Sequence, residues 1–170
     1  MFLDKIFSLF KRKEKPAKFV IFTDPMDNFK INYLENWKFD RDIAVVEGRY
    51  TIPFESKNKN FIVSIDTNIP KNFDFAEYAK SELEGAKSGI FTPIRKGNFR
   101  KMPAYIRNYS YTTRQGEYFG GGIMFFTGRV VFSILWSGPN QEKEKLEPIF
   151  AKMLESIVIT KGCEIKGMGA

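Results

Sequence analysis

The chain has 170 residues, of which 43% are hydrophobic and 28% are charged, and its formal net charge is +7. This composition is typical of one globular domain and excludes disordered and fibrous proteins. Because histidine is absent and there is one cysteine, the sequence excludes a Ser-His-Asp triad, an imidazole zinc site and an intrachain disulfide. No run of 18 apolar residues occurs, so no transmembrane helix is predicted.

The first sixteen residues predict an amphipathic helix that Pro16 ends. Its apolar residues precede its basic ones, which is the reverse of a signal peptide, so no export signal is expected. One interpretation is an anchor on anionic lipid at the inner membrane surface. The other is a helix that packs on the domain or on a second copy. The candidate contact residues are Phe2, Leu3, Ile6, Phe7, Phe10, Lys11, Arg12 and Lys13.

The next stretch, up to residue 72, predicts short strands joined by turns. KFVIFTDP and NFKINYL are rich in β-formers and are separated by turn residues. A strand pair around Gly48 is expected over residues 43–54. NFIVSID (60–66) predicts one further strand, and a loop containing Pro70 follows it.

The second half predicts two helices with strands between them. Residues 73–89 carry Phe75, Ala79 and Leu83 at helical spacing, and Gly89 is the expected end. Strands are expected over 90–99, 103–113 and in a hairpin from 117 to 136 that turns near Gly128. The last helix is expected to hold Pro148 in its first turn or to kink there. Its predicted core stripe is Leu146, Ile149, Phe150, Met153, Leu154 and Ile157. This order predicts an α+β fold with an antiparallel sheet.

FKINYLENWKF resembles the opening of PsbP-type domains, and the later strings EYA, MPAY and MLESI follow in the order of that family. The superfamily includes the photosystem II extrinsic protein PsbP, Ran-binding nuclear import factors and DcrB-type lipoproteins. The resemblance implies an α/β/α sandwich around a central antiparallel sheet and a binding or assembly module. We therefore expect a helix over 1–16, a PsbP-like domain over 17–160 and a flexible tail over 161–170, with Trp37 in the core.

The segment from Gly85 to Gly116 contains seven basic residues and no acid. Within it, MPAYIRNYSYTTR places tyrosines and Arg107 on one side of a predicted strand. Charge combined with stacking rings is typical of sites for single-stranded nucleic acid or another polyanion, and charge alone suits lipid headgroups or an acidic protein. The competing interpretation is a solvated sheet edge with inward tyrosines. The candidate surface is Arg95, Lys96, Arg100, Lys101, Tyr105, Arg107, Tyr109, Tyr111 and Arg114.

Candidates for chemistry are few. Gly120, Gly121 and Gly122 are followed by a strand, which favours a bulge, a bend or a close approach within a strand over a phosphate cradle. A carboxylate-dependent hydrolase would have to use the pairs Asp40/Asp42 or Asp24/Asp27, which lie in predicted turns. We therefore expect no catalytic residue, cofactor or metal.

The expected function is a non-catalytic binding or assembly module in the cytoplasm, peripheral to the inner membrane if residues 1–16 form the anchor. A protein is the main expected partner, ahead of anionic lipid and nucleic acid. The sequence leaves the identity of that partner and the oligomeric state open.

Overall fold

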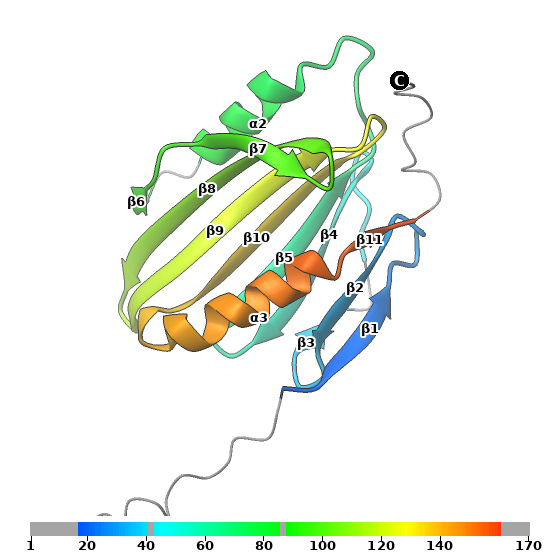
Figure 1. The fold of residues 1–170 in the computed structure, drawn as a ribbon. Helices are drawn as coiled ribbons and strands as arrows, with labels where there is room; N and C mark the ends of the chain where they lie inside the picture. Colours follow the sequence, from blue (N-terminus) through cyan, green and yellow to red (C-terminus); the bar gives the residue numbers. More distant parts are fainter. Residues whose placement is uncertain (1–16, 41–42, 86–87, 161–170) are drawn as a thin grey trace, which may run out of the picture.

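A computed structural model describes residues 17–40, 43–85 and 88–160 (Figure 1). Eight strands form the larger antiparallel sheet. In spatial order they are β3 (Lys38–Phe39), β4 (Arg49–Ser56), β5 (Lys59–Asp66), β10 (Val131–Pro139), β9 (Gly116–Phe126), β8 (Met102–Thr113) and, along the outer edge of β8, β6 (Ile90–Phe91) and β7 (Arg95–Phe99).

A second, smaller sheet contains β1 (Phe19–Thr23), β2 (Phe29–Leu34) and β11 (Val158–Ile159) in the order β1-β2-β11. The described helices are α2 (Phe75–Glu84) and α3 (Lys143–Glu155), and a short 3-10 turn over Asn140–Glu142 leads into α3. Helix α2 covers one face of the larger sheet, while α3 and the small sheet cover the other (Figure 1). The predicted α/β/α sandwich is confirmed.

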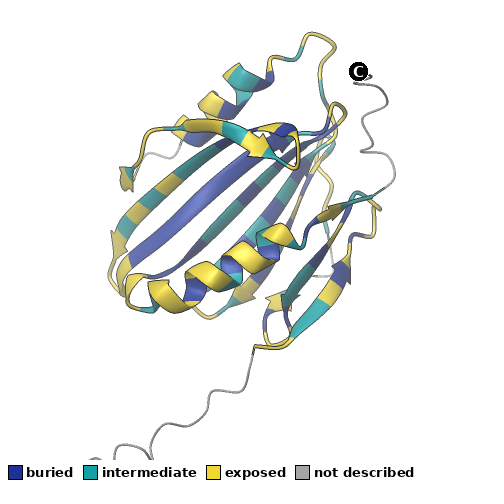
Figure 2. Cartoon of the chain, viewed as in Figure 1, coloured by how far each residue is buried: buried dark blue, intermediate teal, exposed yellow. Residues whose placement is uncertain are grey.

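The main core lies between the larger sheet and the layer that contains α3. Phe54, Phe61 and Phe132 are fully buried there, because alternate residues of each strand point to this face. Trp37 is 5% exposed and Phe150 3% exposed, which confirms that both are core residues. The inner side of α3 is correspondingly buried in Figure 2.

Helix α2 begins at a side-chain cap. The Asp74 carboxylate accepts hydrogen bonds from the backbone N–H groups of Ala76 (2.9 Å) and Glu77 (3.1 Å), which satisfies two N–H groups that have no partner within the helix. Phe75, Ala79 and Leu83 form the buried stripe, as predicted. The helix ends at Gly85, four residues earlier than expected, since glycine is a poor helix former.

Three other details differ from the sequence-based expectations. Residues 43–46 form no strand, only a single bridge between Val46 and Arg49, and Val46 is 66% exposed. The expected strand 90–99 is divided into β6 and β7 around Pro93, which has no N–H to donate to a sheet. Helix α3 starts at Lys143, so Pro148 lies in its second turn.

Candidate binding cleft

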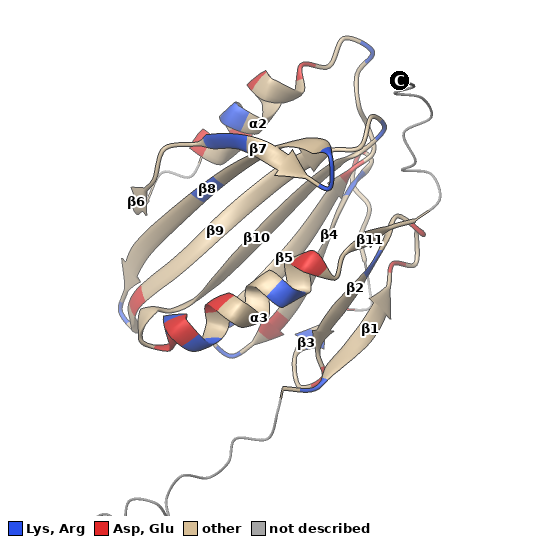
Figure 3. Cartoon of the chain, in the orientation of Figure 1, with Lys and Arg blue, Asp and Glu red and all other residues tan. Residues whose placement is uncertain are grey.

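The basic residues of the segment 85–116 do not converge on one face. Arg95 pairs across the sheet with Ile106 and Lys96 with Tyr105, so these two neighbours point to opposite faces. Lys101 is in the turn between β7 and β8, and Arg114 is in the distant turn between β8 and β9. Figure 3 shows the positions along β7 and β8. Within the described residues no ion pair joins these cations to a carboxylate.

The side chain of Arg107 is hydrogen-bonded to the backbone of neighbouring elements. Its Nη1 donates to the carbonyl oxygen of Leu83 (2.7 Å) and its Nε to that of Thr92 (3.0 Å), while the guanidinium lies 4.4 Å from the centre of the Phe91 ring. Leu83 belongs to the last turn of α2, where carbonyls lack helical partners and a cation is favoured. Arg107 therefore caps α2 and holds the break between β6 and β7.

Arg100 plays the same part at the other helix. Its guanidinium donates to the carbonyl oxygen of Glu155, the last residue of α3. Arg100 and Lys101 have φ values of 48° and 71°, a conformation that a two-residue hairpin turn requires but that side chains other than glycine and asparagine disfavour. Two arginines of the basic segment thus cap the two helices, on opposite sides of the sheet.

We expect Arg107→Met to lower the free energy of unfolding by about 1–2 kcal/mol, because two carbonyl groups lose their donor. Arg114→Met removes an exposed arginine that has no ion pair with any described residue, and it should stay within about 0.5 kcal/mol of the parent. Urea denaturation of both variants measures the difference. Equal midpoints would show that the Arg107 contacts contribute nothing to the fold.

The tyrosines of β8 lie against the sheet on the side of α2. Tyr109 donates to the backbone carbonyl of Trp136 (3.1 Å) and the Tyr111 hydroxyl meets that of Ser137 (3.3 Å), so both reach across β9 to β10. Tyr111 also stacks on Tyr118 at 5.2 Å. Burial, with a smaller contribution from Tyr111, raises the pKa of Tyr109 to about 12. The inward interpretation of these rings is the one the structure supports.

The triple glycine of β9 makes this close approach possible on both faces. A Cβ on Gly120 would lie 2.5 Å from the Tyr109 ring. On the other face, a Cβ on Gly121 would lie 2.5 Å from the indole of Trp136 and 2.9 Å from the side-chain oxygen of Asn108. Of the bulge, bend or close approach expected for these glycines, the structure shows the close approach, and the indole of Trp136 comes this near to β9 because Gly121 has no side chain.

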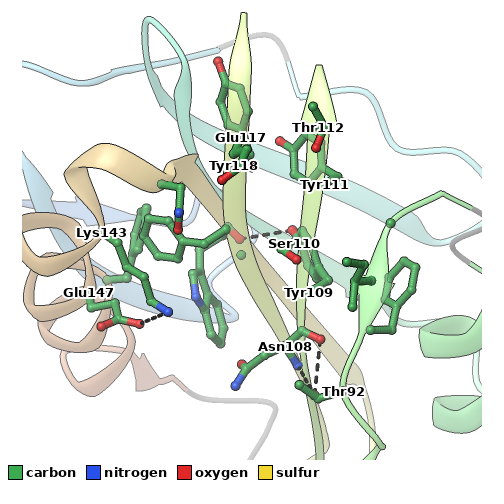
Figure 4. Close-up of a pocket in the computed structure, with 18 of the residues that line it drawn as sticks. Thr92, Asn108, Tyr109, Ser110, Tyr111, Thr112, Glu117, Tyr118, Lys143 and Glu147 are labelled. Atoms are coloured by element: carbon green, nitrogen blue, oxygen red, sulfur yellow. Dashed lines mark hydrogen bonds and ion pairs between the residues drawn. The ribbon is translucent and has the colours of Figure 1, made fainter. Parts of the chain in front are cut away.

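That indole lies on the floor of a cleft of about 900 Å³. One wall is the side of α3 that carries Lys143, Glu147 and Leu154, and the other is the edge formed by β6. Between them, β8 contributes Asn108 and Ser110 (Figure 4). The lining takes in residues 108–112 of β8, so Tyr109 and Tyr111 border the cleft as well, and Asn108, Ser110 and Thr112 point to the face opposite to those tyrosines.

The polar side chains of the cleft are largely unused by the fold. Asn108, Ser110 and Thr112 are exposed, and their side chains form no hydrogen bond to any described residue. The same holds for the side chain of Asn140 and for the indole N–H of half-buried Trp136. The exposed side chains among them are open to solvent and are available, together with the indole N–H, to hydrogen-bond a polar ligand in this cleft.

Sequence reasoning did not find this cleft. Trp136 lies in an apolar run that predicts a strand, and Asn108 and Ser110 are individually unremarkable polar residues. The available signal was the alternation along β8, in which polar residues at 108, 110 and 112 replace the apolar ones at 104 and 106. A strand whose inner face changes from apolar to polar is leaving the core.

Of the carboxylates considered for catalysis, Asp24 is used by the fold itself. Buried Asp24 accepts hydrogen bonds from Tyr50 Oη (2.6 Å) and from the backbone N–H groups of Asn28 (3.0 Å) and Met26 (3.2 Å), so it organises the turn between β1 and β2. Asp42 lies outside the described residues. Residues 17–40, 43–85 and 88–160 contain no cluster of three or more metal-ligating side chains.

Two other predictions concern membranes. Residues 1–16, including the apolar and basic positions expected to meet lipid or protein, lie outside the described residues, so the anchor stays a prediction. Neither of the described helices has the length and apolar character needed to cross a bilayer.

No protein-family model and no curated protein matches the sequence. Among solved structures, the chain is similar to cyanobacterial PsbP (CyanoP) from Synechocystis sp. PCC 6803, with 11% identity and a TM-score of 0.63 over 86% of this chain and 95% of that one. It is also similar to PA94 from Pseudomonas aeruginosa, a protein of unknown function titled a putative regulator, with 14% identity, a TM-score of 0.51 and coverage of 84% and 97%.

At these identities the likeness establishes the fold. The chain has a PsbP-like α+β fold, with a mostly antiparallel sheet and two helices among the described residues. The resemblance carried by the sequence motifs is thereby confirmed at the level of architecture.

Proposed function

We propose that this chain is a non-catalytic binding module of PsbP-like fold and that its ligand occupies the cleft between α3 and the strands β6 and β8. The observation that carries the proposal is the set of unused hydrogen-bonding side chains around the indole of Trp136. A cleft of about 900 Å³ is in the range of ligand sites, which combine an apolar floor with a few polar groups.

Binding is favoured over catalysis because the cleft offers weak chemistry. Its nucleophile candidates are hydroxyl groups, and the chain has no histidine to activate them. Of its two carboxylates, Glu117 lies directly opposite Thr112 on β9 and Glu147 is engaged with Lys143 at 3.7 Å. The polyanion alternative has less support, since the guanidinium groups of Arg100 and Arg107 donate hydrogen bonds to helix carbonyl oxygens. These contacts leave the cleft as the best-supported site.

A photo-crosslinking residue at position 110 of the full chain tests the proposal in its native cells. Position 51 on β4 is the matched control, because Thr51 is also an exposed strand residue but points to the opposite face of the sheet. We expect a specific adduct from position 110 and none from position 51. Adducts from both positions, or none from position 110, would refute the cleft as the binding site.

A further inference from the structure

We infer that the occupant of the cleft is an extended, uncharged segment of a partner protein that lies along β8, with one apolar side chain against Trp136. This inference rests on the proposed function and adds the chemical class of the ligand. It comes from four features of the described cleft: the spacing of the polar groups, the apolar patches on its walls, its charge and its length.

The polar side chains on the floor are spaced for a peptide backbone. Asn108, Ser110 and Thr112 occupy alternate positions on β8 and point to the same face, so they follow one another at about 6.8 Å. An extended peptide presents its backbone C=O and N–H groups on one side with the same two-residue repeat. Each of these three side chains can therefore meet one backbone group of a segment aligned with β8.

The walls provide places for apolar side chains between the polar groups. Ile90 pairs with Ser110 across the sheet and is 79% exposed, which makes it the most exposed large hydrophobic residue among those described. Leu154 of α3 and the indole of Trp136 also line the cleft. A half-exposed indole beside aliphatic side chains is suited to an apolar anchor, and tryptophan is frequent among the residues that dominate interface energies.

The charge of the cleft argues against an acidic ligand. Lys143 is paired with Glu147 at 3.7 Å, and Glu117 at the far end has no ion pair among the described residues. The lining therefore carries one excess negative charge, although the whole chain carries +7. A neutral segment enters without repulsion, whereas a phosphate-rich polymer would be repelled.

The length of the cleft limits the segment to a few residues. Along β8 the lining runs from Asn108 to Thr112, a rise of about 14 Å. An extended chain of about five residues spans that distance. A sugar chain could also stack on the indole, but the aliphatic groups of Ile90 and Leu154 offer a hydroxyl-rich ligand no hydrogen bond. The combination favours a peptide.

The test is a selection of random seven-residue peptides on the full chain, followed by titration of the enriched peptides. We expect enrichment of uncharged sequences with one large apolar residue. Ser110→Arg, which fills the floor from an exposed position, should weaken their binding at least tenfold. Thr51→Arg on the opposite face should leave it unchanged. Trp136→Phe should also weaken binding, and N-methylation of the peptide backbone should weaken it at least tenfold because the backbone groups are what Asn108 and Ser110 contact.

Each other result overturns the inference. If no peptide is enriched, or if enriched peptides bind Ser110→Arg as well as the parent, the peptide assignment is wrong. Titration with cellohexaose and chitohexaose is the second arm. It is followed by the tryptophan fluorescence of the parent, with the Trp136→Phe chain, which retains only Trp37, as the control. A sugar that binds there when no peptide does would leave the proposed binding function intact. If neither ligand class binds and position 110 gives no crosslink, both proposals fail.

Discussion

Replacing Phe150 with alanine is expected to lower the free energy of unfolding by about 3–5 kcal/mol. Phe150 is 3% exposed, and its ring centre lies 6.3 Å from that of Phe61, 6.1 Å from that of Phe119 and 6.1 Å from that of Trp37. It therefore joins α3 to the sheet and to the segment before β3. Alanine would leave a cavity among rings that cannot all move into it. Urea denaturation measures the loss.

Glu144→Ala is the matched control for this variant. Glu144 is exposed in the first turn of the same helix, so its removal costs only the favourable interaction of an acid with the helix amino end, less than about 1 kcal/mol. If Phe150→Ala and Glu144→Ala had similar midpoints, α3 would not be packed against the sheet as described here.

Replacing Gly120 with alanine is expected to destabilise the fold by roughly 2–3 kcal/mol, because a side chain there overpacks the sheet and displaces Tyr109. The added Cβ would lie 2.5 Å from the backbone oxygen of Trp136 and 2.5 Å from the Tyr109 ring. Relief requires Tyr109 to leave, which breaks its 3.1 Å hydrogen bond to that oxygen. Gly97→Ala in β7 is the control, since its Cβ would meet only Ile106 at 4.0 Å.

The ionisation of Tyr109 provides a second measurement on the same variant. Burial raises the pKa of Tyr109 to about 12 in the parent. The stability that depends on the neutral phenol is present below the ordinary pKa of about 10 and is lost as the pH rises through about 12. Displacing the ring in Gly120→Ala should bring its pKa back towards 10, as followed by tyrosinate absorbance. An unchanged titration would contradict the displacement.

Most strands and both described helices could be predicted from local pattern. Apolar residues at every second position of a strand, or at every third or fourth position of a helix, lie on one face, and that face is the one that becomes buried. The stripe of α2 through Phe75, Ala79 and Leu83 is an example. The prediction of a strand failed where strand formation depended on pairing with another strand. Val45 and Val46 have strand-forming side chains, but beyond the single bridge from Val46 to Arg49 they join no described strand, and they remain 49% and 66% exposed.

The candidate site shows the same division. The sequence drew attention to the tyrosines and arginines of the segment 85–116, because charge and aromatic character are evident from the residue type alone. It contained no information on which backbone carbonyls would lie near them, since Leu83 and Glu155 reach Arg107 and Arg100 only in the folded chain. The neutral side of the same strand was overlooked because asparagine and serine become informative only when nothing in the fold satisfies them.

The sequence by itself determined the α+β class, the buried stripes of the helices and the core role of Phe150, which follow from periodicity and side-chain size, both local properties. The PsbP-like order of elements and the core role of Trp37 came from the resemblance to that family, and Gly120 to Gly122 predicted a bulge, a bend or a close approach within a strand. Only the tertiary structure decided that Arg100 and Arg107 cap helices and that Asn108, Ser110 and Trp136 share a cleft. The physical reason is that hydrogen-bond satisfaction and cavity formation depend on groups distant in sequence, which are brought together when β8, β9, β10 and α3 pack.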